Sequence, residues 1–150
     1  TALREANQKR LLMALVYIDL DGFKPINDTY GHYAGDKVLK ITSQRIREVI
    51  RHTDVAARMG GDEFALILNG VQKRSDIDLA LNKLLHTLAI PIDIDNREVQ
   101  VRASAGIALF PQDSRDPVSL CRLADSAMYQ AKSEKNTFRY HAPFRAVELA

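Results

Sequence analysis

A pair of adjacent glycines between two apolar segments is the feature that most restricts the fold. Residues 55–57 and 64–68 are apolar and flank Gly60 and Gly61. Two strand-forming segments joined at such a pair predict an antiparallel hairpin, because a tight turn needs positive φ angles, which glycine adopts without strain. The tip of this hairpin carries Asp62 and Glu63. We therefore expect a pair of carboxylates at one end of a sheet.

A second pair of carboxylates follows another predicted strand. Residues 14–18 form an apolar, β-branched run, and Asp19 and Asp21 come directly after it. Strand ends of one sheet can converge, and converging carboxylates repel each other unless a divalent cation neutralises them. Because Mg²⁺ prefers carboxylate and phosphate oxygens, the two pairs together indicate metal-assisted phosphoryl chemistry. For either pair alone, an ordinary solvated loop is the alternative.

Helices and strands alternate along the rest of the chain. Residues 3–13 are rich in helix formers, and Ser75 and Asp116 stand where they could cap helices. Further helices are predicted over residues 36–51, 75–89 and 117–134, and further strands over 92–94, 99–110 and 137–140. This order predicts an α/β (α+β) fold with a central, mainly antiparallel sheet flanked by helices. The 150 residues suit a single domain, and the abrupt ends suggest a fragment of a larger protein.

Composition limits the partners. The 21 basic and 19 acidic residues leave a net charge of +2, which argues against a nucleic acid partner. There is no apolar run of about 20 residues that could span a membrane, so no membrane contact is expected from this segment. Cys121 is the single cysteine, which excludes an internal disulfide and fits a reducing, cytoplasmic location.

Four ordered segments resemble the motifs of GGDEF domains, the catalytic domains of diguanylate cyclases. They are residues 19–36, 58–64, 104–108 and 124–132, and the similarity extends from about residue 15 to residue 140. The resemblance implies a fold like the palm of class III nucleotide cyclases. It also implies that two GTP molecules, one on each domain of an antiparallel homodimer, condense to cyclic di-GMP and two pyrophosphates.

The resemblance assigns the acidic residues to metal binding and catalysis. Asp19, the main-chain carbonyl of Leu20 and Glu63 would hold Mg²⁺ or Mn²⁺. Asp62 would lie near the attacking 3′-hydroxyl, as a metal ligand or as an aid to its deprotonation.

Further residues would bind the nucleotide by the same resemblance. Gly60 and Gly61 would let it approach the backbone closely. The residues expected to meet the triphosphate are Gly22, Phe23, Lys24, Lys132 and Lys135. Asn27 and Asp36 would read the guanine edge, which favours GTP over ATP. As alternatives, Asn27 and Asp36 could cap helices, and Lys24 could be a solvated surface charge.

Arg51 and Asp54 precede the glycine pair at the spacing of the product-binding Arg-x-x-Asp site of many GGDEF domains. Arginine can stack on guanine or pair with phosphate, and aspartate can accept hydrogen bonds from a guanine edge. The pair therefore predicts feedback inhibition by cyclic di-GMP. An exposed salt bridge at a helix end is the alternative.

The sequence departs from the family pattern in two places. Residues 132–136 are one residue shorter than usual and lack a glycine, and the usual leader is missing before Thr1. These departures support an alternative in which the domain binds GTP or cyclic di-GMP and regulates an attached domain without synthesis. A more distant alternative is a haloacid-dehalogenase-type phosphatase with Asp19 as nucleophile, which requires a doubly wound parallel sheet.

Overall fold

A five-stranded sheet forms the centre of the computed structural model, which describes residues 12–142. The strands lie in the order β2-β3-β1-β6-β7, and only the β6–β7 pair is parallel. Their bounds are β1 Leu12–Asp21, β2 Val55–Gly60, β3 Glu63–Val71, β6 Arg102–Phe110 and β7 Phe138–Tyr140. The predicted hairpin and mainly antiparallel sheet are confirmed. The phosphatase alternative is wrong, because its parallel sheet is not formed.

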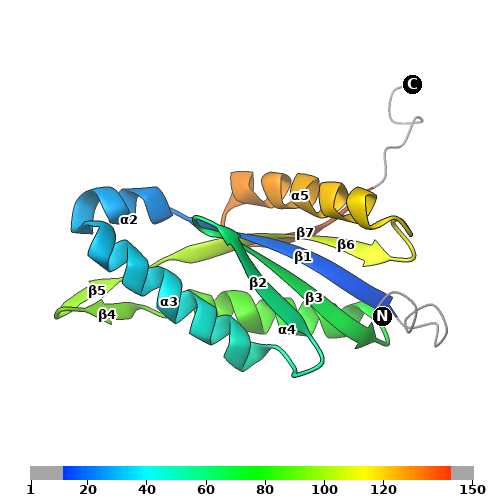
Figure 1. Cartoon of the computed structure of the whole chain (residues 1–150), viewed down its shortest axis with the longest axis horizontal. Helices are drawn as coiled ribbons and strands as arrows, with labels where there is room; N and C mark the ends of the chain where they lie inside the picture. The colour runs from blue at the N-terminus through cyan, green and yellow to red at the C-terminus, as the bar shows by residue number, and fades with distance from the viewer. Residues whose placement is uncertain (1–11, 143–150) are drawn as a thin grey trace.

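Helices cover both faces of this sheet (Figure 1). One face packs against α3 (His32–Val49) and α4 (Arg74–Leu88), and α5 (Pro117–Glu134) lies on the other. The division follows from β1, whose successive side chains point to opposite faces. Val16 and Ile18 belong to the larger core, whereas Met13 and Leu15 pack with Leu120 of α5. The short helix α2 (Phe23–Tyr30) follows β1 directly and leads into α3.

Helix α5 crosses β6 in backbone contact at Gly106. A Cβ atom built on Gly106 would lie 2.0 Å from the backbone nitrogen of Met128 and 2.2 Å from the carbonyl oxygen of Ala124. Such distances are far below van der Waals contact, so only glycine fits at this crossing. Gly106 of the motif at 104–108 therefore has a packing role.

Several predicted boundaries were wrong. Leu12 and Met13 belong to β1 and not to the predicted leader helix, whose residues 3–11 lie outside the described part of the chain. Lys73 is the N-cap residue of α4, so Ser75 does not cap it. Asp116 caps α5 as expected, since its side chain accepts a hydrogen bond from the backbone of Ser119 at 2.9 Å.

The predicted strand over residues 99–110 is divided in two. Strand β5 (Arg97–Val99) pairs with β4 (Ile92–Ile94) in a separate two-stranded sheet, and β6 begins at Arg102. The turn residues Asp95 and Asn96 have φ angles of 51° and 66°. Two successive positive φ angles are typical of the turn that closes a two-residue hairpin. Among the described residues, none of the helices combines the length and apolar character needed to cross a membrane.

Candidate active site

The two acidic pairs meet where β1 and β3 lie side by side. Asp19 of β1 is the antiparallel register partner of Glu63, the first residue of β3. Gly61 and Asp62 form the turn between β2 and β3, and the carbonyl of Asp62 accepts a hydrogen bond from the backbone of Leu20 at 3.2 Å. Directly opposed residues of antiparallel strands have their side chains on the same face. The sheet therefore gathers the carboxylates that the sequence predicted.

Asp19 is a largely buried carboxylate whose charge is only partly compensated. Its Oδ1 atom is buried and makes no hydrogen bond of regular geometry within residues 12–142, although the Nζ atom of Lys132 lies 3.1 Å away. The pKa of Asp19 is raised to about 6: burial is the largest cause, the neighbouring Asp62 acts in the same direction, and Lys132 opposes the shift. Removal from water thus outweighs the attraction of one lysine.

The oxygens at this edge fit a Mg²⁺ ion that keeps other ligands. Residues 12–142 contain no ready-made cluster of three or more acidic, histidine or cysteine side chains that could hold a metal. Asp19, Glu63 and the carbonyl of Leu20 offer only part of a coordination shell. Mg²⁺ in proteins is commonly bound by one or two carboxylates and completed by water and phosphate oxygens. The donor set therefore suits a metal that arrives with a nucleotide.

Asp21 has a different role from Asp19, although the sequence grouped them. The hydroxyl of Ser104 donates to both of its carboxylate oxygens, at 2.8 and 2.9 Å, and the backbone of Asn136 donates to Oδ2 at 2.8 Å. These contacts tie β1 to β6 and to the connection between α5 and β7. Asp21 is thus satisfied by the fold itself.

The same contact holds the end of the segment at residues 132–136, which the sequence predicted to be shortened. Lys135 and Asn136 have φ angles of 65° and 50°, in the region that favours glycine. Asparagine enters this region more readily than most residues, and its backbone N–H is held by Asp21. Lys135 and Asn136 thus take positive φ angles without a glycine, and Asp21 holds the backbone of Asn136.

Of the three lysines predicted to meet the triphosphate, the two at the end of α5 behave differently. The Nζ atom of Lys132 lies 3.1 Å from Oδ1 of Asp19 and donates to the carbonyl of Leu20 at 3.2 Å. Lys132 is therefore brought to the acidic edge. Lys135 is the C-cap residue of α5, and its side chain is exposed and makes no ion pair with a described residue of that edge.

The start of α2 supplies the expected helix N-terminus. Gly22 is its N-cap residue, with a φ angle of 77°, and no side chain caps the first turn. Uncapped backbone N–H groups at a helix start form a favourable site for anions. Phe23 is buried as a core residue, and the side chain of Lys24 is exposed at the same turn.

Asn27 and Asp36 lie within α2 and α3, so neither caps a helix as the alternative proposed. The Oδ1 atom of Asn27 is buried without a hydrogen-bond partner among the described residues. Asp36 lines an open cleft of about 210 Å³ between α3 and β2, together with Arg58. The structure thus leaves both side chains with unused hydrogen-bonding capacity.

Arg58 was not assigned a role by sequence reasoning, although it begins the motif at residues 58–64. Its Nε atom donates to the carbonyl of Gly61 at 3.0 Å. The side chain thereby braces the hairpin turn while lining the cleft beside Asp36. Its position two residues before the glycine pair was the signal that could have identified it.

Gly35→Ala tests the expectation that Asn27 contacts guanine, because it should weaken guanine binding through that side chain. A Cβ atom at Gly35 would lie 1.7 Å from Oδ1 of Asn27, so the amide side chain must turn away. Because that side chain is flexible, the free energy of unfolding should change by less than about 1 kcal/mol. The affinity for a fluorescent GTP analogue should fall about tenfold, the value of one good hydrogen bond.

A double-mutant cycle with Asn27→Ala tests this route. If Gly35→Ala acts through Asn27, the double variant should bind the analogue no more weakly than Asn27→Ala alone. Additive losses would contradict the prediction.

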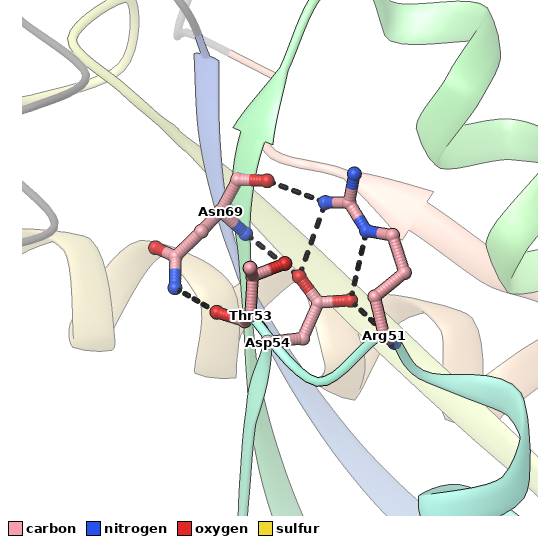
Figure 2. A network of polar contacts seen from close by, with 4 residues as sticks. All are labelled: Arg51, Thr53, Asp54 and Asn69. Carbon is pink, nitrogen blue, oxygen red and sulfur yellow. Dashed lines mark hydrogen bonds and ion pairs between the residues drawn. The ribbon is translucent and has the colours of Figure 1, made fainter.

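Arg51 and Asp54 form a closed network at the turn before β2 (Figure 2). Both oxygens of Asp54 accept hydrogen bonds from the Arg51 guanidinium, at 3.1 and 3.3 Å. The backbones of Arg51 and Asn69 also donate to Asp54, at 2.9 and 3.0 Å, and Arg51 donates to the carbonyl of Asn69. The side chain of Asp54 is 3% exposed and that of Arg51 is 56% exposed. The salt bridge of the alternative therefore exists, with Asp54 as its buried centre.

A cleft of about 380 Å³ adjoins this network. Arg51 and Asp54 line it, and most of the other lining residues are apolar, among them Leu66, Leu68 and Ile77. A ligand in this cleft would meet the exposed guanidinium of Arg51 beside an apolar wall.

The sheet and its acidic edge define a mixed α+β domain of the nucleotide-cyclase-like class. A sequence model described as "Diguanylate cyclase, GGDEF domain" matches residues 1–137. The chain therefore belongs to the GGDEF domain family, as the motifs predicted.

Two relatives from Pseudomonas aeruginosa are each 41% identical to the chain. They are the bifunctional diguanylate cyclase/cyclic di-GMP phosphodiesterase MucR, matched over 133 residues, and the diguanylate cyclase TpbB, matched over 134. Each match covers 89% of this chain but only 19% of MucR and 31% of TpbB. The chain thus spans less than a third of the length of these relatives.

Solved structures agree with this assignment. The crystal structure of the TpbB GGDEF domain has a TM-score of 0.91 and 39% identity, and the match covers 95% of this chain and 90% of that one. The GGDEF domain of DgcB from Caulobacter crescentus, solved in complex with c-di-GMP, has a TM-score of 0.79 and 29% identity, with 94% and 83% covered.

Proposed function

We propose that this domain is a diguanylate cyclase, which condenses two GTP molecules to cyclic di-GMP and two pyrophosphates. The observation that carries the proposal is the register pairing of Asp19 with Glu63, beside a buried carboxylate oxygen without a regular hydrogen bond. Membership of the family and the diguanylate cyclases among the relatives support the choice of reaction. The expected setting is a cytoplasmic domain of a longer protein.

The residues of each domain would bind one GTP. Asn27 and Asp36 would contact the guanine edge, and the first turn of α2 with Lys24 would meet the triphosphate. Gly60 and Gly61 expose backbone at the turn, where a Cβ at either position would meet no atom within 4 Å, so the space is open for a ligand.

The reaction needs two domains facing each other antiparallel, because each 3′-hydroxyl attacks the α-phosphate of the other GTP. Asp19, Glu63 and the carbonyl of Leu20 would hold Mg²⁺ or Mn²⁺, which neutralises the triphosphate and polarises the α-phosphate when bound. Asp62 would lie near the 3′-hydroxyl and assist loss of its proton. Two phosphodiester bonds form, two protons are lost from the hydroxyls, and two pyrophosphates leave.

Mass detection of the product tests this proposal. The protein is incubated at high concentration with GTP and Mg²⁺, and cyclic di-GMP is expected to form. Glu63→Gln should abolish the product, whereas Glu98→Gln, an exposed position on β5, should not. If the unsubstituted protein forms no cyclic di-GMP at any concentration, the proposed reaction is wrong.

The product is also proposed to inhibit the enzyme at Arg51 and Asp54. The exposed guanidinium beside the apolar cleft suits a guanine or phosphate group of cyclic di-GMP. The DgcB structure supports the family's capacity to bind this nucleotide.

We expect substitution of Arg51 to affect mainly product inhibition and substitution of Asp54 to affect mainly the stability of the fold. Arg51→Ala should raise the cyclic di-GMP concentration needed for inhibition at least about tenfold, because the cation that faces the ligand is lost. The fold should be retained, because the backbones of residues 51 and 69 still donate to the carboxylate of Asp54. Asp54→Ala should lower the free energy of unfolding by about 2–3 kcal/mol, because two backbone N–H groups and Arg51 lose a buried acceptor. Urea unfolding and inhibition curves measure both effects.

Arg122→Ala, at an exposed position on α5, is the control for loss of an arginine. Unchanged inhibition in Arg51→Ala would disprove the feedback site.

A second candidate is a GTP-binding or product-binding module without synthesis that regulates an attached domain. It is favoured by one observation, the contact of Lys132 with the proposed metal ligands. Calorimetric binding of GTP without formation of any product would support it.

A further inference from the structure

The ammonium group of Lys132 is surrounded by the oxygens proposed to bind a metal. It lies 3.1 Å from Oδ1 of Asp19, 3.2 Å from the carbonyl oxygen of Leu20 and 3.6 Å from Oδ1 of Asp21. Two of these three oxygens belong to the proposed ligand set. A positive charge of the protein itself therefore lies where a cation would be expected.

The surrounding carboxylates differ in how far other groups already compensate their charge. Asp21 already accepts hydrogen bonds from Ser104 and Asn136. Oδ1 of Asp19, by contrast, is buried and lacks a regular hydrogen bond among the described residues. Lys132 thus mainly compensates the charge of Asp19, which is further disfavoured by the nearby Asp62.

The backbone of Lys132 belongs to a packed helix, whereas its side chain is partly exposed and can move. The preceding residue, Ala131, is fully buried, and α5 packs closely against the backbone of β6 at Gly106. The side chain of Lys132 is nevertheless 38% exposed. A flexible four-carbon chain from a fixed helix can move its ammonium group by a few ångströms without disturbing the fold.

An ammonium group and a divalent cation cannot share these oxygens. Both would lie within a few ångströms of Asp19, where like charges repel strongly because little water separates them. Binding of a metal to Asp19 and Leu20 therefore requires Lys132 to leave. The displaced ammonium would then lie close to the metal-bound phosphates. Their negative charge would take the place of Asp19 as its partner.

We propose that Lys132 acts as an internal substitute for the metal ion in the nucleotide-free domain. It occupies the oxygens of Asp19 and Leu20 and gives them up when a metal–nucleotide complex supplies both a cation and phosphates. The inference rests on the proposed function for its choice of metal ligands. Metal alone then binds weakly, and metal and nucleotide strengthen each other's binding by the same factor.

Titration of the nucleotide-free protein with Mn²⁺, followed by electron paramagnetic resonance, tests the inference. Lys132→Met removes the charge and keeps much of the side-chain volume, so it should raise the Mn²⁺ affinity about tenfold or more. The rise in melting temperature on adding Mn²⁺ should likewise be larger in Lys132→Met than in the unsubstituted protein. The same variant should bind a non-hydrolysable GTP analogue with metal more weakly.

Two further variants serve as controls. Lys132→Arg keeps the charge and should leave the Mn²⁺ affinity low. Lys83→Met removes a positive charge from an exposed position of α4, on the opposite face of the sheet, and should leave the Mn²⁺ affinity unchanged. Equal or lower Mn²⁺ affinity in Lys132→Met would overturn the inference, as would an equal gain in Lys132→Arg or Lys83→Met.

This test is independent of turnover. If the protein forms no cyclic di-GMP but Lys132→Met gains Mn²⁺ affinity, the cyclase proposal fails and the role of Lys132 stands. If cyclic di-GMP forms and the Mn²⁺ affinity of Lys132→Met is unchanged, the cyclase proposal stands and the proposed role of Lys132 is wrong.

Discussion

Gly106→Val is expected to lower the free energy of unfolding by at least about 4 kcal/mol, a large share of the 5–15 kcal/mol typical of a domain. The first carbon of the new side chain would lie 2.0 Å from the backbone nitrogen of Met128. Backbone atoms of a helix cannot move aside as a side-chain end can. The substitution must therefore separate α5 from β6 along the whole crossing.

Urea unfolding followed by circular dichroism measures this loss. Ala57→Val is the matched control, because it places a valine on the exposed edge strand β2. That change should stay within about 0.5 kcal/mol, as is usual at exposed positions. A Gly106→Val protein as stable as the control would show that α5 is not held against the sheet as described.

Asp19→Asn is expected to have opposite effects on activity and on stability. Turnover of GTP should fall at least about a thousandfold, because the amide cannot replace a carboxylate that neutralises a metal. The metal-free domain should nevertheless become more stable at neutral pH. Asparagine removes a buried charge that Lys132 only partly compensates.

The pH dependence follows from the direction of the shift. Burial raises the pKa of Asp19 to about 6, from an ordinary value of 3.8, so the folded state binds the proton more tightly than the unfolded state. The stability contributed by the protonated form is complete below about pH 4 and is lost as the pH rises through 6. The advantage of Asp19→Asn should thus be greatest above pH 6 and disappear near pH 4.

Urea unfolding in the presence of a chelator, between pH 4 and pH 8, measures this difference. Asp21→Asn is the control from the same strand. It should destabilise the domain at neutral pH, because it weakens an acceptor already used by Ser104 and Asn136. Equal destabilisation by both substitutions at pH 8 would refute the assignment of an uncompensated charge to Asp19.

The carboxylate edge could be predicted from sequence because its parts are local. An apolar run followed by acidic residues, and a glycine pair between apolar segments, each specify a strand and its end within ten residues. The predicted ends of strands that depend on packing with distant segments were less accurate. The break between β5 and β6 arises because β5 turns back onto β4 while β6 joins β1, a choice that local sequence does not encode.

The amino-acid sequence alone specifies the glycine-pair hairpin and the family of the chain, because turn geometry and motif spacing are properties of neighbouring residues. Which carboxylate of β1 remains available depends on contacts between distant segments of the fold. Asp21 is held by Ser104 and Asn136, which lie 83 and 115 positions away in the chain. Asp19 is left with Lys132, delivered by a helix that approaches the sheet closely enough because residue 106 has no side chain.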